Sequence, residues 1–361
     1  MSEYQVLVQP SGRSFPARAD ETVLAAASRA GITLPHGCRT GACGSCRGRV
    51  LSGSVEHASH AEGALSGADA TEGHALFCSA FARSDLVIES RIAEGVDGIV
   101  ARKMPARIEH IERVASDVAL LSLRLPASED FRFRPGQYVD FILPGGLRRS
   151  YSIAAPAREG APLEFHIRHM AGGVFTDALF GLAGAPSVKE RGILRIEGPL
   201  GTFYLRTEDS APIVLLASGT GFAPIKAIAE QIFAAGLHRE DPAGRRPARP
   251  VVLYWGARAR ADLYLDALPR SWEANEPNFR YVPVLSEPQP GDAWEGRTGF
   301  VHHAVMEDLP DLSGHHVYAC GVPVMVQSAQ HDFISRCGLP ETNFFCDAFV
   351  SAADIAKAHG A

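Results

Sequence analysis

Three cysteines near the N-terminus have a spacing that few kinds of chemistry use. Cys38, Cys43 and Cys46 follow a C-x4-C-x2-C pattern in a loop rich in glycine and small residues. The next cysteine along the chain is Cys78, so the full pattern is C-x4-C-x2-C-x31-C. A structural zinc site usually combines two C-x2-C-like knuckles, and this stretch holds one. The four thiols therefore favour a metal centre of another kind, with a zinc loop or a chance thiol cluster as the alternatives.

The four-cysteine spacing is typical of a plant-type [2Fe–2S] cluster. Small residues surround the thiols, namely Gly37, Gly41, Gly44 and Ser45. They let the backbone wrap closely and point N–H groups at cluster sulfurs, which stabilises the more negative, reduced state. The predicted metal ligands are Cys38, Cys43, Cys46 and Cys78.

A second group of chemically useful side chains lies in the segment RRSYSIA, residues 148–154. A flavin needs a cation for its pyrophosphate, an aromatic face for its ring and a hydroxyl near N5. Arg149, Tyr151 and Ser152 could supply all three from one strand, because Arg149 and Tyr151 lie on the same face. The segment GGVFT at 172–176 would place backbone amides and a helix start on the phosphates. Each segment alone is compatible with an ordinary strand or turn, but their order predicts a flavin site.

Two glycine turns in the last third of the chain predict a nucleotide site. The turn GTG at 219–221 joins the apolar strand PIVLLAS to a helical segment, and Cys320 ends a second strand. An anionic pyrophosphate docks at such strand ends in a doubly wound sheet. The turn is shorter than the full G-x-G-x-x-G pattern, and Cys320 alone also fits a small buried residue.

The choice of nicotinamide nucleotide depends on charges after the strand VVLYWGA. A 2′-phosphate favours arginine and a free ribose diol favours a carboxylate. Arg258, Arg260 and Asp262 follow that strand and offer both. We expect NADH, with NADPH as the alternative.

Three blocks of elements would position these residues. Residues 1–92 combine short strands with a helix and the cysteine loop, and 93–104 is expected to be a linker. Residues 105–208 contain six short alternating strands and one helical run, a pattern typical of an antiparallel barrel. Residues 209–361 alternate apolar strands with helices, which indicates a doubly wound parallel sheet. The predicted fold is multidomain, with α+β and α/β parts.

Composition excludes several functional classes. The chain has 361 residues and a formal net charge of −6, whereas nucleic-acid binding needs a basic face. No apolar run approaches the roughly 20 residues that cross a bilayer, and the first residues lack an export signal. Seven cysteines in such a chain point to metal or redox chemistry more than to disulfides. We expect a cytoplasmic protein that binds neither nucleic acid nor membrane.

The 14 histidines raise the question of a second metal. His302-His303 and His315-His316 are adjacent pairs. Neighbouring residues point to opposite sides of a strand and chelate poorly. We interpret both pairs as surface or core residues.

The order of motifs resembles one known superfamily along essentially the whole chain. The ferredoxin cysteines are followed by R-x-Y-S, G-G-x-x-T, G-T-G-x-x-P and C-G-x-P-x-M. This order resembles the ferredoxin–NADP⁺ reductase superfamily with a plant-type ferredoxin, a β-grasp domain, fused in front. Within it, the chain is similar to reductase components of aromatic ring-hydroxylating oxygenases, such as terephthalate dioxygenase reductases. It also resembles CDP-6-deoxyglucoseen reductases.

The resemblance implies FAD, a [2Fe–2S] cluster and a nicotinamide nucleotide, with specific residues for each. It implies catalytic roles for Ser152 and Asp347 near flavin N5 and for Cys320 near the nicotinamide. The implied cofactor-binding residues are Arg149, Ser150, Tyr151, Ser152, His166, Ile167, Arg168, Gly173, Val174, Phe175, Thr176, Gly219, Thr220, Gly221, Pro224, Arg258, Cys320, Gly321 and Phe349. Twelve residues follow Phe349, whereas many relatives end at the aromatic residue that shields the flavin.

The implied function is electron transfer from NAD(P)H through FAD and the cluster to a separate partner. That partner would be a Rieske-type terminal oxygenase of an aromatic ring-hydroxylating or demethylating system. The alternative is an iron–sulfur deoxysugar dehydratase. The partner would dock near the cluster loop, around Arg39, Thr40, Arg47 and Arg49. The chain is expected to be a monomer.

Overall fold

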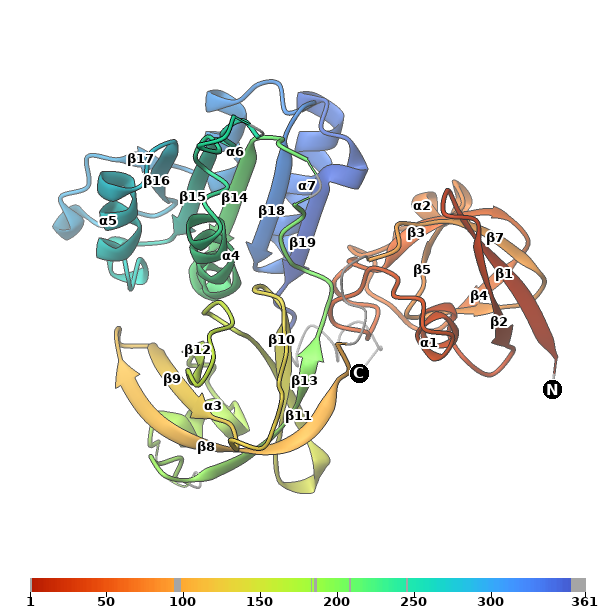
Figure 1. Ribbon diagram of the computed structural model, residues 1–361, viewed down its shortest axis with the longest axis horizontal. Coiled ribbons are helices and arrows are strands. Elements are labelled where there is room, and N and C mark those ends of the chain that lie inside the picture. Colours follow the sequence, from red (N-terminus) through yellow and green to blue (C-terminus); the bar gives the residue numbers. More distant parts are fainter. Residues whose placement is uncertain are drawn as a thin grey trace.

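In this computed structural model the structure describes residues 2–93, 99–182, 184, 187–207, 209–244 and 246–351. Three domains follow one another along the chain and are called here the N-terminal, barrel and C-terminal domains (Figure 1). The predicted linker covers residues 93–104. Of these, 94–98 lie outside the described residues, and 102–104 belong to the first barrel strand.

The N-terminal domain is a small mixed sheet that packs on one helix. Its five strands have the order β2-β1-β7-β3-β5, with the parallel pair β1 and β7 near the centre. Thr22 caps the helix by accepting a hydrogen bond from Ala25 N, and apolar side chains of helix and sheet form the core. The elements are β1 (Glu3–Gln9), β2 (Arg13–Arg18), α1 (Val23–Arg29), β3 (Arg47–Ser52), β4 (Val55–His57), α2 (Gly67–Thr71), β5 (His74–Leu76), β6 (Ala80–Ala82) and β7 (Leu86–Glu89).

The barrel domain contains the six predicted antiparallel strands. Their order is β11-β10-β13-β8-β9-β12, and inward side chains such as Phe141 and Phe165 fill the interior. The first strand begins at Arg102, three residues before the predicted boundary, because Arg102 already pairs with Gly198 of β13. The elements are β8 (Arg102–Arg113), β9 (Val118–Arg124), β10 (Tyr138–Ile142), β11 (Arg148–Ser152), β12 (Leu163–Arg168), α3 (Val174–Leu179) and β13 (Ile193–Leu200).

The C-terminal domain is a six-stranded parallel sheet with helices on both faces. Its order is β17-β16-β15-β14-β18-β19. The central strand β14 is apolar almost throughout, as expected for a strand buried on both faces. The elements are β14 (Ile213–Ser218), α4 (Phe222–Ala234), β15 (Val251–Ala257), α5 (Ala267–Asn275), β16 (Phe279–Leu285), β17 (Arg297–Thr298), α6 (Val301–Asp308), β18 (His316–Gly321), α7 (Pro323–Cys337) and β19 (Phe344–Ala348).

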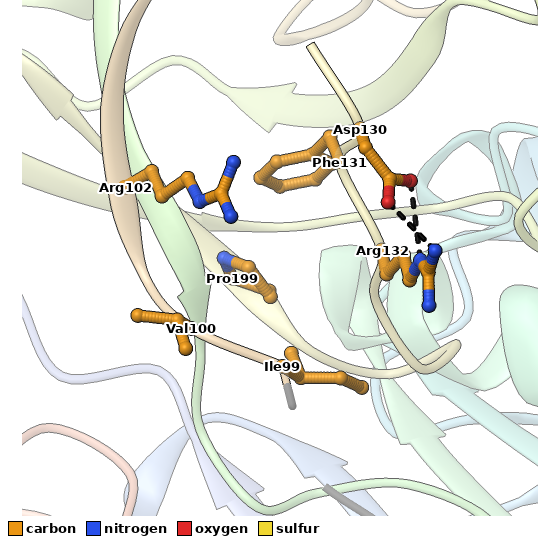
Figure 2. A pocket seen from close by; sticks show the side chains of 7 residues that line it. All are labelled: Ile99, Val100, Arg102, Asp130, Phe131, Arg132 and Pro199. Atoms are coloured by element: carbon orange, nitrogen blue, oxygen red, sulfur yellow. Dashed lines mark hydrogen bonds and ion pairs between the residues drawn. The ribbon is translucent and has the colours of Figure 1, made fainter. Parts of the chain in front are cut away.

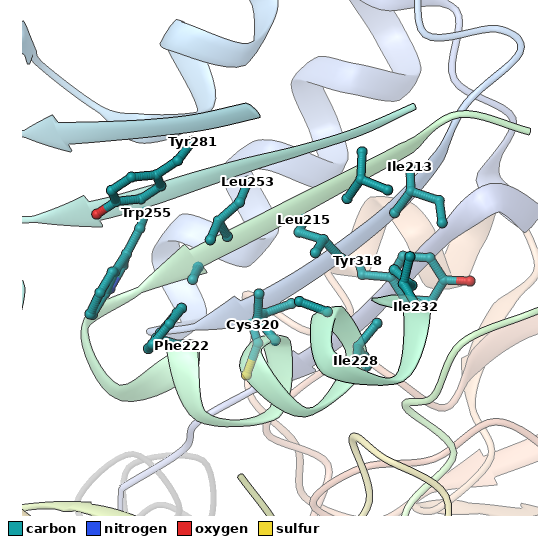
Figure 3. Packing of buried hydrophobic residues seen from close by; sticks show 14 of the residues in the cluster. Ile213, Leu215, Phe222, Ile228, Ile232, Leu253, Trp255, Tyr281, Tyr318 and Cys320 are labelled. Carbon is teal, nitrogen blue, oxygen red and sulfur yellow. The ribbon is translucent and has the colours of Figure 1, made fainter. Parts of the chain in front are cut away.

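Each face of this sheet has its own apolar core. On one face, Phe222, Ile228 and Ile232 of α4 pack against Leu215 and Leu253 (Figure 3). The opposite core joins strands β14, β15, β16 and β18 to helices α6 and α7. Because the chain leaves β14 first toward β15 and later returns at β18, the strand order reverses beside β14. Ligands of doubly wound sheets bind at the carboxyl ends of strands at such a point.

The structure corrects one prediction about the histidines. His302 and His303 lie in the first turn of helix α6 and not on a strand, and their ring centroids are 4.2 Å apart. The two side chains therefore do not point to opposite sides. None of the helices within the described ranges is long and apolar enough to cross a membrane.

Candidate functional site

The four predicted cysteine ligands lie together at the inner edge of the N-terminal domain. Cys43 and Cys46 are buried, while Cys38 and Cys78 are partly exposed. Backbone amides point at the sulfurs, since Cys38 N donates to Cys43 Sγ at 3.3 Å and Thr40 N donates to Cys38 Sγ at 3.4 Å. Such donors stabilise thiolates, the form that binds iron.

The thiols form two pairs, which fits two iron atoms better than one zinc. A hydrogen bond from Cys43 lowers the pKa of Cys38 to about 5, and one from Cys46 lowers the pKa of Cys78. Within the described ranges, no three of the thiol sulfurs all lie within 4.8 Å of one another. A mononuclear tetrahedral site would bring its ligands closer together than that. The donor set therefore fits a [2Fe–2S] cluster in which each iron takes one pair.

The cluster loop packs against both other domains. Tyr138 of the barrel donates its hydroxyl to Gly37 O at 2.8 Å, and His36 N donates to Thr202 Oγ1 at 2.9 Å. On the other side, Ser45 Oγ lies 3.4 Å from both Cys43 Sγ and the carbonyl oxygen of Cys346 on β19. These contacts hold the predicted cluster ligands at the junction of the three domains.

Gly37 lies at the centre of this junction, where even a Cβ would be tightly packed. A Cβ there would lie 3.3 Å from Cys43 Sγ, 3.3 Å from Asp347 Oδ1 and 3.1 Å from Ser45 Oγ. One glycine thus separates a predicted cluster sulfur from a predicted catalytic carboxylate.

Asp347 also meets the predicted flavin strand. The Ser152 hydroxyl donates to Asp347 Oδ2 across a long hydrogen bond of 3.5 Å, and both residues are buried. Burial raises the pKa of Asp347 to about 7, with a further contribution from the negative charge of the Cys38 thiolate. A serine hydroxyl and a carboxyl group near neutrality, held together by two domains, are suited to hold or pass a proton.

Strand β11 and the segment after β12 build the predicted flavin site on the barrel. Tyr151 has its ring centroid 4.8 Å from that of Phe141 and 5.7 Å from that of Phe175, so the barrel core fixes its orientation. Burial raises the pKa of the Tyr151 hydroxyl, which stays neutral. Arg149 is half-buried on the same strand, and the hydroxyl of Ser150 donates to Asp140 Oδ1 at 2.6 Å.

The glycine segment before α3 forms a tight turn. A Cβ on Gly173 would lie 2.8 Å from Met170 O, which favours glycine at this position. Gly173 is the cap residue of α3, and Thr176 lies in the first turn of the helix. Thr176 Oγ1 donates to Met170 O at 2.9 Å and closes the turn. Val174 is exposed on this turn, as a ligand contact requires. This arrangement fits a flavin held between the strand and the turn.

The predicted nucleotide turns pack directly on each other at the carboxyl ends of β14 and β18. A Cβ on Gly221 would overlap the carbonyl oxygen of Cys320, and a Cβ on Gly321 would overlap Ser218 Oγ. Both positions therefore require glycine. Gly219 has a positive φ of 51°, and its carbonyl oxygen accepts a hydrogen bond from the Trp255 indole at 3.0 Å. Thr220 beside it is partly exposed, while Pro224 lies buried in the first turn of α4.

Several predicted cofactor residues are buried in packing contacts. Ile167 and Phe175 lie in the barrel core, and the Cys320 thiol is fully buried beside Phe222 (Figure 3). His166 is enclosed by hydrogen bonds to Tyr264 and Glu164, each at 2.9 Å. These residues support the walls of the predicted site from behind.

Two predicted arginines lie along the edge of the C-terminal domain. Arg168 reaches from β12 to the turn at Gly219, where a Cβ would lie 3.6 Å from its Nη1. Its Nε is 3.3 Å from Asp117, and its Nη2 is 3.8 Å from Asp262. Arg258 is exposed after β15 and lies 3.8 Å from the same Asp262. Phe349 follows β19, and its N–H donates to Gly321 O at 2.7 Å.

A cavity of about 170 Å³ on the barrel lies outside this site. It is bounded by Arg102, Phe131 and Pro199 and contains the ion pair of Asp130 and Arg132 at 2.8 Å (Figure 2). Its volume is below that of ordinary ligand pockets, and none of the predicted site residues lines it.

Sequence reasoning missed the residues that join the domains. Tyr138 and Thr202 contact the cluster loop from the barrel, and Lys226 of α4 binds Glu164 and the carbonyl oxygen of Ala154 on the barrel. The local sequence predicts an ordinary strand residue at Tyr138 and an exposed helix residue at Lys226. No local pattern marks either, because their partners are distant in the chain.

Family models match the three domains in the order found in the structure. A 2Fe-2S iron-sulfur cluster binding domain matches residues 6–83, an oxidoreductase FAD-binding domain matches 105–204, and an oxidoreductase NAD-binding domain matches 215–331.

Relatives of known name extend over nearly the whole chain. The CDP-6-deoxy-L-threo-D-glycero-4-hexulose-3-dehydrase reductase of Yersinia pseudotuberculosis is 40% identical over 96% of this chain and 98% of its own. Reductase component 1 of terephthalate 1,2-dioxygenase from Comamonas is 34% identical over 97% and 98%. The reductase subunit of an aromatic O-demethylase from Amycolatopsis is 38% identical over 91% and 94%.

Solved structures show the same arrangement of domains. The crystal structure of the Amycolatopsis cytochrome P450 reductase GcoB matches with a TM-score of 0.70 and 33% identity, over 97% of this chain and 99% of that one. A ferredoxin reductase in carbazole 1,9a-dioxygenase matches with a TM-score of 0.65 and 25% identity, over 97% and 99%.

Proposed function

From the premise that this chain belongs to the family of reductases with 2Fe-2S, FAD-binding and NAD-binding domains in one polypeptide, we propose that it delivers electrons to a separate terminal oxygenase. The chain is an NAD(P)H-dependent oxidoreductase. The proposed acceptor is a Rieske-type oxygenase of an aromatic ring-hydroxylating or demethylating system. The proposed reductase acts as a monomer in the cytoplasm, where thiols stay reduced.

One observation carries the proposal: Gly37 lies between a cluster sulfur and the carboxylate that meets the flavin strand. When bound, the flavin would supply the chemistry that couples two-electron hydride transfer to one-electron transfer. Because Cys43 and Asp347 both lie next to Gly37, the predicted cluster site and the predicted flavin site would be close neighbours. A protein that only bound or sensed a nucleotide would have no need to bring these groups together.

The roles of the site residues follow from their positions. Arg149 and the turn at Gly173 would hold the flavin phosphates, and the fixed ring of Tyr151 would stack on the flavin. Ser152 and Asp347 would hold or move a proton beside N5. The turns at Gly219 and Gly321 would bind the nicotinamide nucleotide, with Arg258 and Asp262 at its ribose.

The proposed cluster ligands have different surroundings. Cys43 packs with side chains of the C-terminal domain, whereas Cys78 is partly exposed on the side of the N-terminal domain. Arg39 and Arg49 are exposed near this loop, while Arg47 is paired with Asp69 at 2.8 Å. An acidic surface on the acceptor would complement these arginines.

Reconstitution with defined acceptors tests the proposal. The FAD- and cluster-loaded chain would be mixed with NADH and a purified Rieske-type oxygenase from the same cells, and product formed per NADH oxidised would be measured. We expect coupled turnover that a Cys78→Ser variant lacks, although that variant still reduces ferricyanide through the flavin. Reduction of cytochrome c without any coupled product would show that the chain transfers electrons from NADH but that the tested oxygenase is not its acceptor.

A second acceptor class is favoured by one observation. The identity to the hexulose dehydrase reductase, 40%, exceeds the 34% to the terephthalate dioxygenase reductase. An iron–sulfur sugar dehydratase is therefore the alternative acceptor. The same assay with a purified dehydratase and its CDP-sugar distinguishes the two, because only the true partner should accelerate NADH oxidation with product formed in proportion.

A further inference from the structure

A group of potential metal-ligand side chains lies on the C-terminal domain, and none of its members is a predicted cofactor-binding or catalytic residue. His302 and His303 of α6 and Asp332 of α7 each offer one ligand atom, and these atoms lie within 4.8 Å of one another. Helices α6 and α7 cover the same face of the sheet (Figure 1). The group therefore bridges two helices, with His302 and Asp332 30 positions apart in the chain.

His302 is the least satisfied member of this group. It is 7% exposed, and its Nδ1 is buried with no hydrogen-bond partner among the described residues. Its Nε2 is 3.5 Å from Asp332 Oδ2, longer than a good N–H···O hydrogen bond. Nε2 therefore faces the Asp332 carboxylate without a short hydrogen bond, and it is the nitrogen available to a metal ion on this side.

The spacing of these atoms suits ligands of one metal ion. Two donors bound to zinc at about 2.0–2.1 Å in a tetrahedral site are roughly 3.3 Å apart. The 3.5 Å between His302 and Asp332 is close to that separation. The second carboxylate oxygen, Oδ1, is 3.6 Å from Arg336, which would orient the carboxylate from outside.

We propose that His302, His303 and Asp332 bind a divalent first-row metal ion such as Zn²⁺, with water completing the coordination. Two imidazoles and one carboxylate are borderline donors that suit zinc, and His303 is exposed enough to admit an ion from solvent. The ring of Phe300 stacks near His302, with centroids 6.0 Å apart, and covers one side of the site.

Local electrostatics favour the neutral histidine that a metal needs. Burial lowers the pKa of His302, and the neighbouring His303 lowers it further. A metal ion at this position would pin the start of α6 to the middle of α7. It would stabilise the folded domain without taking part in electron transfer.

Zinc titration of the holoenzyme tests the proposal. The chain, loaded with FAD and cluster and without a histidine tag, would be titrated with Zn²⁺ by calorimetry. Three variants would be compared with the wild type: His303→Gln, Asp332→Asn and the matched control His331→Gln. His331 is an exposed histidine on α7, next to Asp332, that lies outside the group.

We expect one tight site per chain in the wild type and in H331Q, weakened about tenfold or more in H303Q and D332N. Zinc should raise the melting temperature of the first two proteins and not of the others. Bound Cu²⁺ in the oxidised enzyme should give an electron paramagnetic resonance spectrum with two coupled nitrogens, reduced to one in H303Q. Identical titration curves for all four proteins would overturn the proposal, whether all of them bind zinc or none does.

Discussion

Ser152 and Asp347 are 195 positions apart in the chain, yet they meet in a buried contact. Each is held by a different domain, Ser152 at the end of β11 and Asp347 within β19. Because neither domain supplies both groups, the proton chemistry proposed here exists only when the barrel and C-terminal domains are assembled. The glycines at the nucleotide turns depend on tertiary contacts within the C-terminal domain, because each is required by the chain segment that packs on it.

Replacement of Ser152 by alanine tests the proton role. We expect the reduction of bound FAD by NADH to slow by about 10²-fold, because one positioned acid–base group is lost. Stopped-flow absorbance at the flavin band would measure the rate, and flavin content would show that binding is intact. The control is Ser271→Ala, a serine exposed on α5. Equal rates in S152A and wild type would remove Ser152 from the mechanism.

Gly221→Ala tests the close approach of the two nucleotide turns. The new Cβ would overlap the carbonyl oxygen of Cys320, so β14 and β18 must separate. We expect a lower melting temperature and at least a tenfold higher KM for NADH, since even modest overpacking costs about 1–3 kcal/mol. Gly314→Ala, in the same domain with nothing within 4 Å of its Cβ, should behave as wild type. A G221A enzyme with normal KM would show that the turns can yield.

At this scale the sequence predicts ligand types better than environments. The spacing of Cys38, Cys43 and Cys46 predicts three cluster ligands from one short segment, and Cys78 is the predicted fourth. Cys320 and Ile167 were also expected at the cofactors, and the structure buries both side chains. Burial depends on which strand packs alongside, and that information is not local. The same reason explains why His302 and His303 were assigned to a strand.

Among the elements, helix α4 and strand β12 carry the main polar link between the barrel and the C-terminal domain. Lys226 Nζ lies 2.9 Å from Glu230 and 3.2 Å from Glu164, and it is almost fully buried. His166 and Tyr264 extend the network to the start of α5. These contacts set the angle at which the nucleotide turn faces the flavin strand.

Lys226→Met tests this link. The change leaves Glu164 and Glu230 with one cation fewer in a buried interface, and loss of one buried partner typically costs about 3–5 kcal/mol. We expect a lower melting temperature and slower reduction of FAD by NADH. Lys189→Met removes an exposed lysine of the barrel and should change neither quantity. If K226M melts like the wild type, the network does not hold the domains together.

The elements themselves were largely predictable. Alternation of apolar and polar residues marks the barrel strands, and unbroken apolar runs mark β14 and β18, because burial on one or two faces imposes these patterns. Strand β8 begins at Arg102, three residues before the boundary expected at 105, and its first two residues are exposed and give no apolar signal. Strand pairing at Arg102 has no signature in the local sequence.

Across the whole molecule, the N-terminal domain docks in a defined orientation. Tyr138 and Thr202 hold the cluster loop from the barrel, while Arg91 lies over the ring of Phe345 at 4.6 Å and donates to Thr342 O. The order of motifs predicts three domains but not this docking, because it rests on single side chains from distant segments.

Tyr138→Phe tests whether docking controls transfer to the cluster. The variant leaves the Gly37 carbonyl oxygen without its phenol donor, a loss of about 1 kcal/mol or more. We expect cluster reduction, followed by rapid-freeze electron paramagnetic resonance, to slow about fivefold, with unchanged reduction of the flavin. Tyr4→Phe, which changes a partly buried tyrosine packed against the core of the N-terminal domain, should have no such effect. Slowing of both steps together would instead indicate damage to the flavin site.

The docked cluster loop has a consequence for how the enzyme responds to dilution. Because the cluster domain is part of the same chain and already rests on the other two domains, its local concentration at the flavin is fixed by the tether and not by the amount of protein. Transfer into the cluster is then a first-order event. Delivery to an outside acceptor remains a collision between two molecules. At low enzyme concentration, the rate of internal transfer to the cluster therefore stays the same, while the rate of delivery to the acceptor falls.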